Sequence, residues 1–275
     1  MGGPRFTTAL LVGVTAFCWL HSAAAQPCAL EAGSSHAVAR AIDGETLLLD
    51  DGQEVRLIGA LAPKPETLPV DGPGWPAAQD ALRALQTLVH DRTIALRYEG
   101  RRHDRYGRIL AQVFVADGGT DVWVQERLVA DGHARAYTLP GNTSCLGGLL
   151  KAERAARVAK RGLWQRETYR VRSADDVESL LKLVGRFVLV EGRVAEVTRA
   201  QRTTYINFGT DWRRDFTANL ATANVTDSSA ATTRVDGLVG KRIRVRGWIE
   251  RRNGPMIGLS SLDGIELLEE GSEPP

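Results

Sequence analysis

Apolar and polar residues alternate along residues 36–58 in three short runs that tight turns separate. The runs are residues 36–42, 45–49 and 53–58, and Asp43-Gly44 and Asp51-Gly52 stand between them. Asp-Gly is a strong hairpin signal because both central positions of such a turn take positive φ. The pattern therefore predicts a three-stranded meander, and similar runs predict two more strands at residues 93–98 and 109–114.

Apolar residues at helical spacing predict three helices in the same part of the chain. The first spans residues 75–90, with Ala78, Leu82, Leu85 and Val89 on one face. The second is expected at residues 121–130, with Asp121 at its start, and the third at residues 145–161, ending before Gly162. We expect a mainly β domain over residues 26–165, with five strands and three helices.

The pattern changes after residue 165. A charged stretch without periodicity at residues 166–175 predicts a linker, followed by a short helix around residues 174–183. Short strands are then expected at residues 187–197, 204–208, 215–221, 243–249, 257–259 and 265–268. The sequence predicts a second, smaller OB-like β-barrel over residues 176–268 and a disordered tail at residues 269–275.

The first 25 residues have the pattern of a secretory signal peptide. Arg5 precedes the apolar residues 9–20, and small residues lead to a predicted cleavage site between Ala25 and Gln26. The apolar run is too short for a stable membrane span, although an uncleaved anchor is the alternative. We expect the mature protein to be periplasmic or secreted and to lack a membrane span.

Charge and cysteine content add one constraint each. The formal net charge is +2, so total charge predicts no strong affinity for polyanions, and the excess of arginine over lysine is typical of a GC-rich coding bias. Cys18 would leave with the signal peptide, which leaves Cys28 and Cys145. An even pair of cysteines in an exported protein predicts a disulfide.

Six segments of the first domain, taken in order, resemble the staphylococcal nuclease (thermonuclease) family: residues 42–46, 55–59, 104–108, 128–134, 140–143 and 161–164. Each segment is weak alone, but the ordered set covers residues 36–164 on matching predicted elements. The resemblance implies a five-stranded OB barrel with three helices that binds DNA or RNA across its face. It also implies Ca²⁺-dependent cleavage of phosphodiester bonds.

The resemblance assigns roles to individual residues. Arg56 and Arg108 match the two arginines that hold phosphate, because a forked guanidinium binds phosphate oxygens through paired hydrogen bonds. Asp43 and Glu45 match the acidic positions near the metal, since Ca²⁺ prefers oxygen ligands. The alternatives are a solvated strand position for Arg56 and a turn position paired with Asp104 for Arg108. Turn chemistry alone would also explain Asp43.

The sequence departs from the family at two functional positions. Leu61 stands where the family has a metal-ligating aspartate, and Lys64 stands where it has the water-activating glutamate. If the loop is longer here, Glu66 is the candidate general base. Lys64 would otherwise offer a fixed positive charge to phosphate, which favours binding over metal-dependent hydrolysis.

Further candidates for nucleic-acid contact surround these positions. Arg105, Tyr106 and Tyr137 match positions that contact phosphate and stack on bases, although both tyrosines could be half-buried residues of the barrel rim. His36, His103 and His133 are isolated and lack metal-ligand spacing. In the second domain, aromatic residues beside arginines over residues 205–216 suggest a stacking platform or a hairpin with a hydrophobic core.

Together these features predict an exported thermonuclease-like hydrolase of DNA or RNA with a degenerate metal site. The alternatives are a catalytically inactive nucleic-acid-binding protein and an envelope interaction module that uses both barrels as a scaffold.

Overall fold

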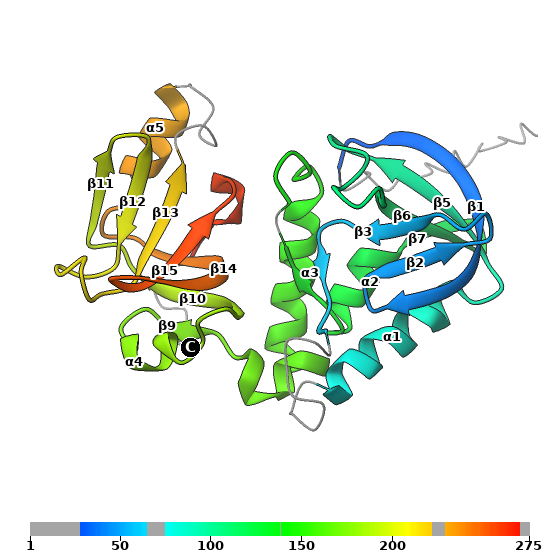
Figure 1. Ribbon diagram of the computed structural model, residues 1–275, viewed down its shortest axis with the longest axis horizontal. Helices are drawn as coiled ribbons and strands as arrows, with labels where there is room; N and C mark the ends of the chain where they lie inside the picture. Colours follow the sequence, from blue (N-terminus) through cyan, green and yellow to red (C-terminus); the bar gives the residue numbers. More distant parts are fainter. Residues whose placement is uncertain (1–27, 65–74, 138, 222–228, 270–275) are drawn as a thin grey trace, which may run out of the picture.

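The computed structural model describes residues 28–64, 75–137, 139–221 and 229–269. The expected signal peptide, Glu66 and residues 270–275 lie outside these ranges. Two β domains stand side by side and are joined by a short segment with two 3-10 turns, Gly162–Gln165 and Glu167–Tyr169 (Figure 1). No helix in the described part of the chain is long and apolar enough to cross a membrane.

Five strands close the first barrel, as the sequence predicts. In spatial order they run β3-β2-β1-β5-β6, and a parallel pairing of β3 with β6 closes the ring. Their bounds are β1 (Glu31–Asp43), β2 (Thr46–Leu49), β3 (Glu54–Leu57), β5 (Thr93–Tyr98) and β6 (Ile109–Asp117). The closed barrel leaves few exposed strand edges and encloses a core that includes Leu47, Leu96 and Val113.

Three helices and two short strand pairings complete this domain. The helices are α1 (Trp75–Val89), α2 (Val124–Ala130) and α3 (Leu146–Val158). The predicted helix at residues 121–130 starts three residues late, because Thr120–Trp123 (β7) pairs with the end of β6 across Gly118 and Gly119, both at positive φ. Ala60–Leu61 (β4) pairs with Arg135–Ala136 (β8) beside the barrel, a contact that the sequence pattern does not reveal.

The second β domain is built on one eight-stranded sheet. Its main path is β11-β12-β13-β15-β14-β10-β9, and its β13–β15 pairing is parallel, as the β3–β6 pairing is. The strands are β9 (Arg172–Ser173), β10 (Phe187–Arg193), β11 (Glu196–Ala200), β12 (Thr203–Asn207), β13 (Thr217–Ala221), β14 (Arg242–Arg252), β15 (Gly254–Leu259) and β16 (Glu266–Leu267). β9 lies in the stretch expected to be a linker and pairs with β10.

Two details of the second domain differ from the pattern-based expectation. The single strand expected at residues 187–197 breaks between β10 and β11, because the N–H of Val194 bonds to Lys241 while the next N–H, of Ala195, bonds to Asn207. The chain there passes from one neighbouring strand to another. Helix α4 (Val177–Leu181) is shorter than expected, and α5 (Ser229–Asp236) was not expected.

The predicted disulfide between Cys28 and Cys145 is confirmed. The two Cα atoms lie 4.9 Å apart, and the bond joins residues 117 positions apart in the sequence. It fastens the start of the described chain to the N-terminal end of α3. A cross-link over so long a loop stabilises the folded state by roughly 4–5 kcal/mol on loop-entropy arguments.

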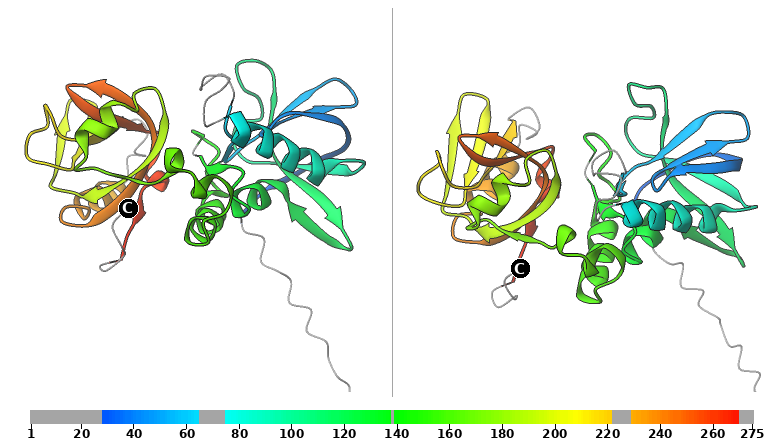
Figure 2. Two further views of the ribbon diagram at one scale, coloured as in Figure 1. Left: turned by 90° about the horizontal axis from the view of Figure 1, so that it is seen from below. Right: turned by 60° about the horizontal axis from the view of Figure 1, so that its bottom comes forward.

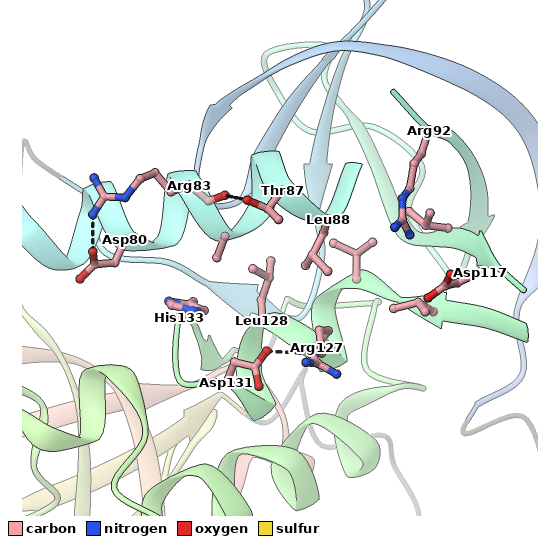
Figure 3. A pocket seen from close by; sticks show the side chains of 14 residues that line it. Asp80, Arg83, Thr87, Leu88, Arg92, Asp117, Arg127, Leu128, Asp131 and His133 are labelled. Atoms are coloured by element: carbon pink, nitrogen blue, oxygen red, sulfur yellow. Dashed lines mark hydrogen bonds and ion pairs between the residues drawn. The ribbon is translucent and has the colours of Figure 1, made fainter. Parts of the chain in front are cut away.

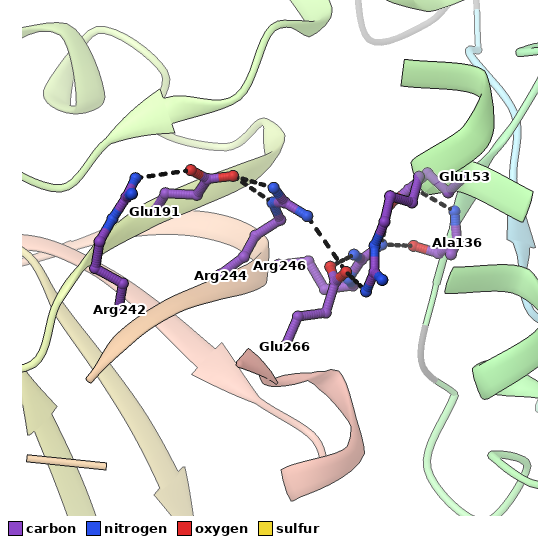
Figure 4. Close-up of polar contacts among 8 residues, drawn as sticks. Ala136, Glu153, Glu191, Arg242, Arg244, Arg246 and Glu266 are labelled. Atoms are coloured by element: carbon purple, nitrogen blue, oxygen red, sulfur yellow. Dashed lines mark hydrogen bonds and ion pairs between the residues drawn. The ribbon is translucent and has the colours of Figure 1, made fainter. Parts of the chain in front are cut away.

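A buried ionic network holds the two domains together. Helix α3 lies on the side of the first barrel that faces the second domain (Figures 1 and 2). Its Glu153 accepts hydrogen bonds from the N–H of Ala136 at 2.8 Å and from the Arg246 guanidinium of β14 at 2.9 Å. Both side chains are fully buried, and Arg246 also bonds to the carbonyl of Ala136 and to Glu266 (Figure 4).

The network continues away from the interface within the second domain. Arg244 donates to Glu191 and lies 3.3 Å from Glu266, and Arg242 pairs with the other oxygen of Glu191. Burial alone would lower the pKa of Arg246, but Glu153 and Glu266 outweigh it and the net pKa is raised. Each buried charge of this network therefore has a counter-charge, which is the condition under which buried ions are tolerated.

Candidate functional site

The turn between β1 and β2 presents two carboxylates at one end of the first barrel. The N–H of Glu45 donates to Oδ1 of Asp43 at 2.9 Å, which is ordinary Asx-turn chemistry. The carbonyl of Glu45 accepts the N–H of Leu57 at 2.8 Å, and its Oε2 accepts the N–H of Ala62 at 2.9 Å. The side chain of Glu45 is 0% exposed, so the barrel itself fixes this carboxylate.

Two cations surround these carboxylates. Arg56 pairs with Thr46 across the β2–β3 ladder, and its Nη2 lies 3.4 Å from Oε1 of Glu45. The ammonium of Lys64 lies 3.1 Å from the same oxygen and 3.3 Å from Oδ2 of Asp43. We call Asp43, Glu45, Arg56 and Lys64 the acid–base cluster; its formal charges cancel. The structure thus brings together four of the residues that the sequence singled out.

The ammonium of Lys64 stays charged in this position. Burial alone would lower the pKa of Lys64, but the carboxylates of Glu45 and Asp43 outweigh that effect and raise the pKa above its ordinary value. Lys64 therefore supplies one of the two positive charges that balance the two acidic side chains, and Arg56 supplies the other.

The acid–base cluster does not fit a Ca²⁺ ion. Calcium takes six to eight oxygen ligands, whereas in the described part of the chain two carboxylates face this position and both are already paired with Lys64. At the third expected ligand position, Leu61 offers no oxygen from its side chain. A cation bound here would have to displace the ammonium of Lys64.

Leu61 has a packing role instead. It is buried in a small apolar cluster with Phe187 and Leu189 of the second domain, and Tyr137 and Trp164 pack against the same cluster. A charged aspartate at this position would lie in that apolar interface, which is costly for an unpaired carboxylate. Leu61 therefore contributes to the contact between the two domains.

Arg108 belongs to a second charged group, in the turn before β6. Its Nε donates to Oδ2 of Asp104 at 2.8 Å, and the N–H groups of Arg108 and Tyr106 both donate to Oδ1. Burial alone would raise the pKa of Asp104, but these hydrogen bonds outweigh it and lower the pKa. The Asp104 pairing that the sequence allowed as an alternative for Arg108 is therefore present.

Strand register relates Arg56 on β3 to the turn with Arg108 that leads into β6. Arg56 pairs with Leu110 in the parallel β3–β6 ladder, and Arg108 precedes Leu110 by two residues. Tyr106 is 68% exposed at the tip of the turn, with the guanidinium of Arg105 4.7 Å from its ring centre. An exposed ring flanked by arginine is a surface on which a base can stack.

Tyr137 lies in the interface between the two domains. Its ring packs edge-on against Phe187 at 6.0 Å and against Trp248 at 5.4 Å, both from the second domain. Burial raises the pKa of Tyr137, although the nearby Arg56 opposes that effect. The residue expected to stack on a base is thus occupied in the domain interface. Glu66, the candidate base, lies outside the described residues.

Other features lie away from the acid–base cluster. A hollow of about 580 Å³ between α1, α2 and the β6–β7 hairpin is lined by charges that pair locally, such as Arg83 with Asp80 and Arg127 with Asp131 (Figure 3). His36 lies with Asp50 and Asp51 near the opposite end of β2, so the histidine that the sequence left isolated has acidic neighbours. None of these residues contacts the acid–base cluster.

The comparison with known proteins agrees with the barrel fold. The staphylococcal nuclease homologue family matches residues 54–166. A thermonuclease of Staphylococcus intermedius is 33% identical over 137 residues, which are 49% of this chain and 78% of the relative. This chain belongs to the staphylococcal nuclease family. A thermonuclease of Staphylococcus hyicus is 31% identical over 133 residues, which are 47% of this chain and 75% of that relative. The endonuclease YncB of Bacillus subtilis is 34% identical over 133 residues, which are 47% of this chain and 61% of that relative.

Membership of the family supports nuclease function at the family level. The matched residues contain Arg56, Leu61, Lys64 and the turn with Arg108, and the match ends before the second domain begins. Sequence reasoning missed two cationic residues near the site, Arg135 on β8 and Arg186 just before β10. The abundance of arginine in the composition had concealed them.

Proposed function

We propose that this chain is a nucleic-acid-binding member of the staphylococcal nuclease family that holds phosphate without a divalent cation. The observation that supports it is the ammonium of Lys64, 3.1 Å from Glu45 and 3.3 Å from Asp43. A positive charge supplied by the protein takes the part that a bound metal would take. The exported character remains part of this proposal, and the disulfide between Cys28 and Cys145 is compatible with it.

The binding surface in this proposal is the charged end of the first barrel. Arg56 lies on β3 and Arg108 in the turn before the neighbouring β6, and their guanidinium groups suit phosphate oxygens. Tyr106 would stack on a base, an interaction worth ~1–3 kcal/mol that tolerates any base sequence. Arg105 adds positive charge beside the ring. The ligand is single-stranded DNA or RNA, because a stacking ring needs an unpaired base.

Hydrolysis lacks a proton acceptor in the described part of this site. A general base must be unprotonated and within reach of the attacking water. Lys64 is protonated, because its pKa is raised. Both oxygens of Glu45 are engaged, one by two cations and the other by the N–H of Ala62. The geometry therefore favours binding over cleavage.

The second candidate function is metal-dependent cleavage of DNA or RNA. It is favoured by the relatives, whose names are thermonuclease and endonuclease, and by the presence of both arginines. This function requires a base that the acid–base cluster does not provide, and Glu66 remains the predicted one. Glu66→Gln would then abolish cleavage and leave binding nearly intact.

The two functions are separated by one experiment on the purified chain. Labelled single-stranded DNA and RNA are incubated with Ca²⁺, Mg²⁺ or EDTA, and both the bound fraction and the strand length are measured. Binding in EDTA with intact strands in all three conditions is the result that we expect. Cleavage in Ca²⁺ that EDTA stops would establish the second candidate, and absence of binding would reject the proposal.

A further inference from the structure

A pocket of about 370 Å³ lies on the second domain and shares no lining residue with the acid–base cluster. Its walls come from β11, β12, β13 and β15, which lie next to one another in the sheet (Figure 1). The loop with Trp212 and the turn with Arg252 and Asn253 complete the lining. Ligand pockets usually measure roughly 300–1,000 Å³, so this pocket has room for a small molecule or for one unit of a chain.

Strand register explains why polar side chains line this pocket. Tyr205 pairs with Asn219 across β12 and β13, and Asn207 pairs with Thr217 further along the same ladder. Residues at alternate positions of a strand share a face of the sheet, so these four side chains lie on one face. Ile206, between two of them on β12, belongs to the hydrophobic core on the opposite face. The pocket therefore lies on the outer face of the sheet.

Two of these outer side chains are nevertheless buried and form the polar floor of the pocket. Asn207 is 5% exposed and Thr217 is 2% exposed. The hydroxyl of Thr217 donates to Oδ1 of Asn207 at 3.2 Å, and Nδ2 of Asn207 donates to the hydroxyl of Thr198 at 3.3 Å. An amide nitrogen carries two hydrogens, so Nδ2 of Asn207 keeps one donor for a ligand.

Two further polar groups of the lining are open to a ligand. The side-chain amide of Asn219 and the hydroxyl of Tyr205 belong to half-buried residues, and neither group makes a hydrogen bond within the described part of the chain. An amide group and a hydroxyl group can each donate and accept hydrogen bonds. These groups match the hydroxyl groups of a saccharide, which also donate and accept.

Trp212 supplies an aromatic wall. It lines the pocket and is 49% exposed in the loop between β12 and β13. The guanidinium of Arg213 lies 4.3 Å from the centre of the indole ring and covers one of its faces. The opposite face remains for a ligand. Because the face of an aromatic ring carries partial negative charge, it attracts the C–H groups on the face of a saccharide ring.

The pocket has little charge with which to hold a phosphate. Of its described lining residues only Arg252 is charged, and its guanidinium lies 3.3 Å from the carboxylate of Glu250. The loop with Trp212 contains two arginines and two aspartates, whose charges cancel: Asp211, Arg213, Arg214 and Asp215. Proteins hold nucleic-acid strands through cationic side chains at the phosphates, so this pocket favours an uncharged ligand.

We propose that this pocket of the second domain binds one ring of a neutral oligosaccharide. Trp212 packs against the C–H face of the ring, and the side chains of Tyr205, Asn207 and Asn219 form hydrogen bonds with its hydroxyl groups. The proposal goes beyond nucleic-acid binding by the first barrel and does not depend on it, because the two sites share no residue.

The test uses the full purified chain and a panel of neutral oligosaccharides built from hexose and N-acetylhexosamine units. Labelled protein is applied to the immobilised panel, and the oligosaccharides that bind are titrated by calorimetry. We expect binding, and we expect Trp212→Ala to weaken it about tenfold or more, as the loss of a central tryptophan contact typically does. Trp212→Phe keeps an aromatic face and should retain most of the affinity.

Two other variants keep the result interpretable. Tyr106→Ala is the matched control, because it removes another exposed ring but lies on the first barrel, and it should leave the saccharide affinity unchanged. Asn219→Ala removes one hydrogen-bonding group of the pocket and should weaken saccharide binding about threefold or more. If Trp212→Ala does not fold, Asn219→Ala still decides the question.

Absence of binding to every oligosaccharide of the panel would overturn the proposal, and so would saccharide affinity that neither Trp212→Ala nor Asn219→Ala changes. An uncharged nucleoside and a single-stranded oligonucleotide are titrated in parallel. If these probes bind, if Trp212→Ala weakens their binding and if no saccharide binds, the pocket takes a nucleobase and the saccharide assignment is wrong. If the chain binds saccharides but no oligonucleotide, the proposed function fails and this proposal stands.

Discussion

The ammonium of Lys64 lies 3.1 Å from Oε1 of Glu45, a carboxylate that the first barrel encloses completely. This pairing leaves the acid–base cluster electrically neutral. A neutral cluster does not repel phosphate. The same region of the barrel can therefore attract a polyanion with protein charges alone.

Removing the charge of Lys64 should weaken nucleic-acid binding. Lys64→Met keeps the length of the side chain but gives the acid–base cluster a net negative charge, which repels phosphate. We expect the affinity for a labelled single-stranded oligonucleotide to fall and the slope of its salt dependence to decrease by about one. Fluorescence anisotropy at several salt concentrations measures both quantities.

The control for this variant is Lys151→Met, which removes an exposed lysine of α3. It should leave the affinity close to that of the wild type. Tighter binding in Lys64→Met would show that Lys64 blocks the phosphate site.

Sequence patterns predict the first barrel well because its signals are local. Asp-Gly turns and alternating runs define β1, β2 and β3, and helical spacing defines α1. The start of α2 was misplaced, because Thr120–Trp123 pairs with β6 across a Gly-Gly turn and this pairing overrides the helical pattern.

The sequence singles out the residues of the acid–base cluster but not the contacts between them. The sequence singles out Leu61 and Lys64, but it does not reveal that Leu61 packs against Phe187 or that Lys64 bridges two carboxylates. Glu153 and Arg246 are 93 residues apart and carry no shared motif, so only the folded chain brings them together. Contacts between domains have no periodic signature in the sequence.

Breaking the buried interdomain pair should destabilise the protein strongly. Arg246→Met leaves the fully buried carboxylate of Glu153 without its counter-charge, which typically costs about 3–5 kcal/mol. Urea unfolding should show this loss and a separation of the single transition into two, since the domains would no longer unfold together.

Arg252→Met is the control: its pair with Glu250 is exposed, and losing it should cost at most about 1 kcal/mol. Equal stability of the two variants would mean that the network does not hold the domains.

The pH dependence of stability should reflect Glu266. Burial alone would raise the pKa of Glu266, but Arg246 and Arg244 outweigh it and the pKa is lowered. A lowered pKa means that the carboxylate contributes stability above its ordinary value, 4.5, and that this contribution is lost as the pH falls through the folded-state value.

Glu266→Gln should therefore differ most from the wild type at neutral pH, with the difference shrinking below about pH 4. Urea unfolding across an acid pH series measures the difference. A gap between the two proteins that stays constant from neutral to acid pH would contradict the assignment.

Arg108 should matter for nucleic-acid binding more than a comparable arginine elsewhere. Arg108→Ala removes a guanidinium beside the exposed ring of Tyr106, and we expect the affinity for a single-stranded oligonucleotide to fall about tenfold or more. The matched control is Arg127→Ala, because Arg127 also pairs with an aspartate four residues away but lies on α2. Gel-shift titrations compare the affinities of the two variants. Equal losses of affinity would show that the effect comes from total protein charge and not from the position of Arg108.

Affinity for an oligonucleotide in Ca²⁺ and in EDTA, at matched ionic strength, tests most directly whether Lys64 serves in place of a metal. The wild-type chain should bind equally in the two conditions, within about twofold, because the same number of phosphate contacts forms without the ion. Affinity that rises about tenfold or more in Ca²⁺, together with shortening of the strand, would contradict the account.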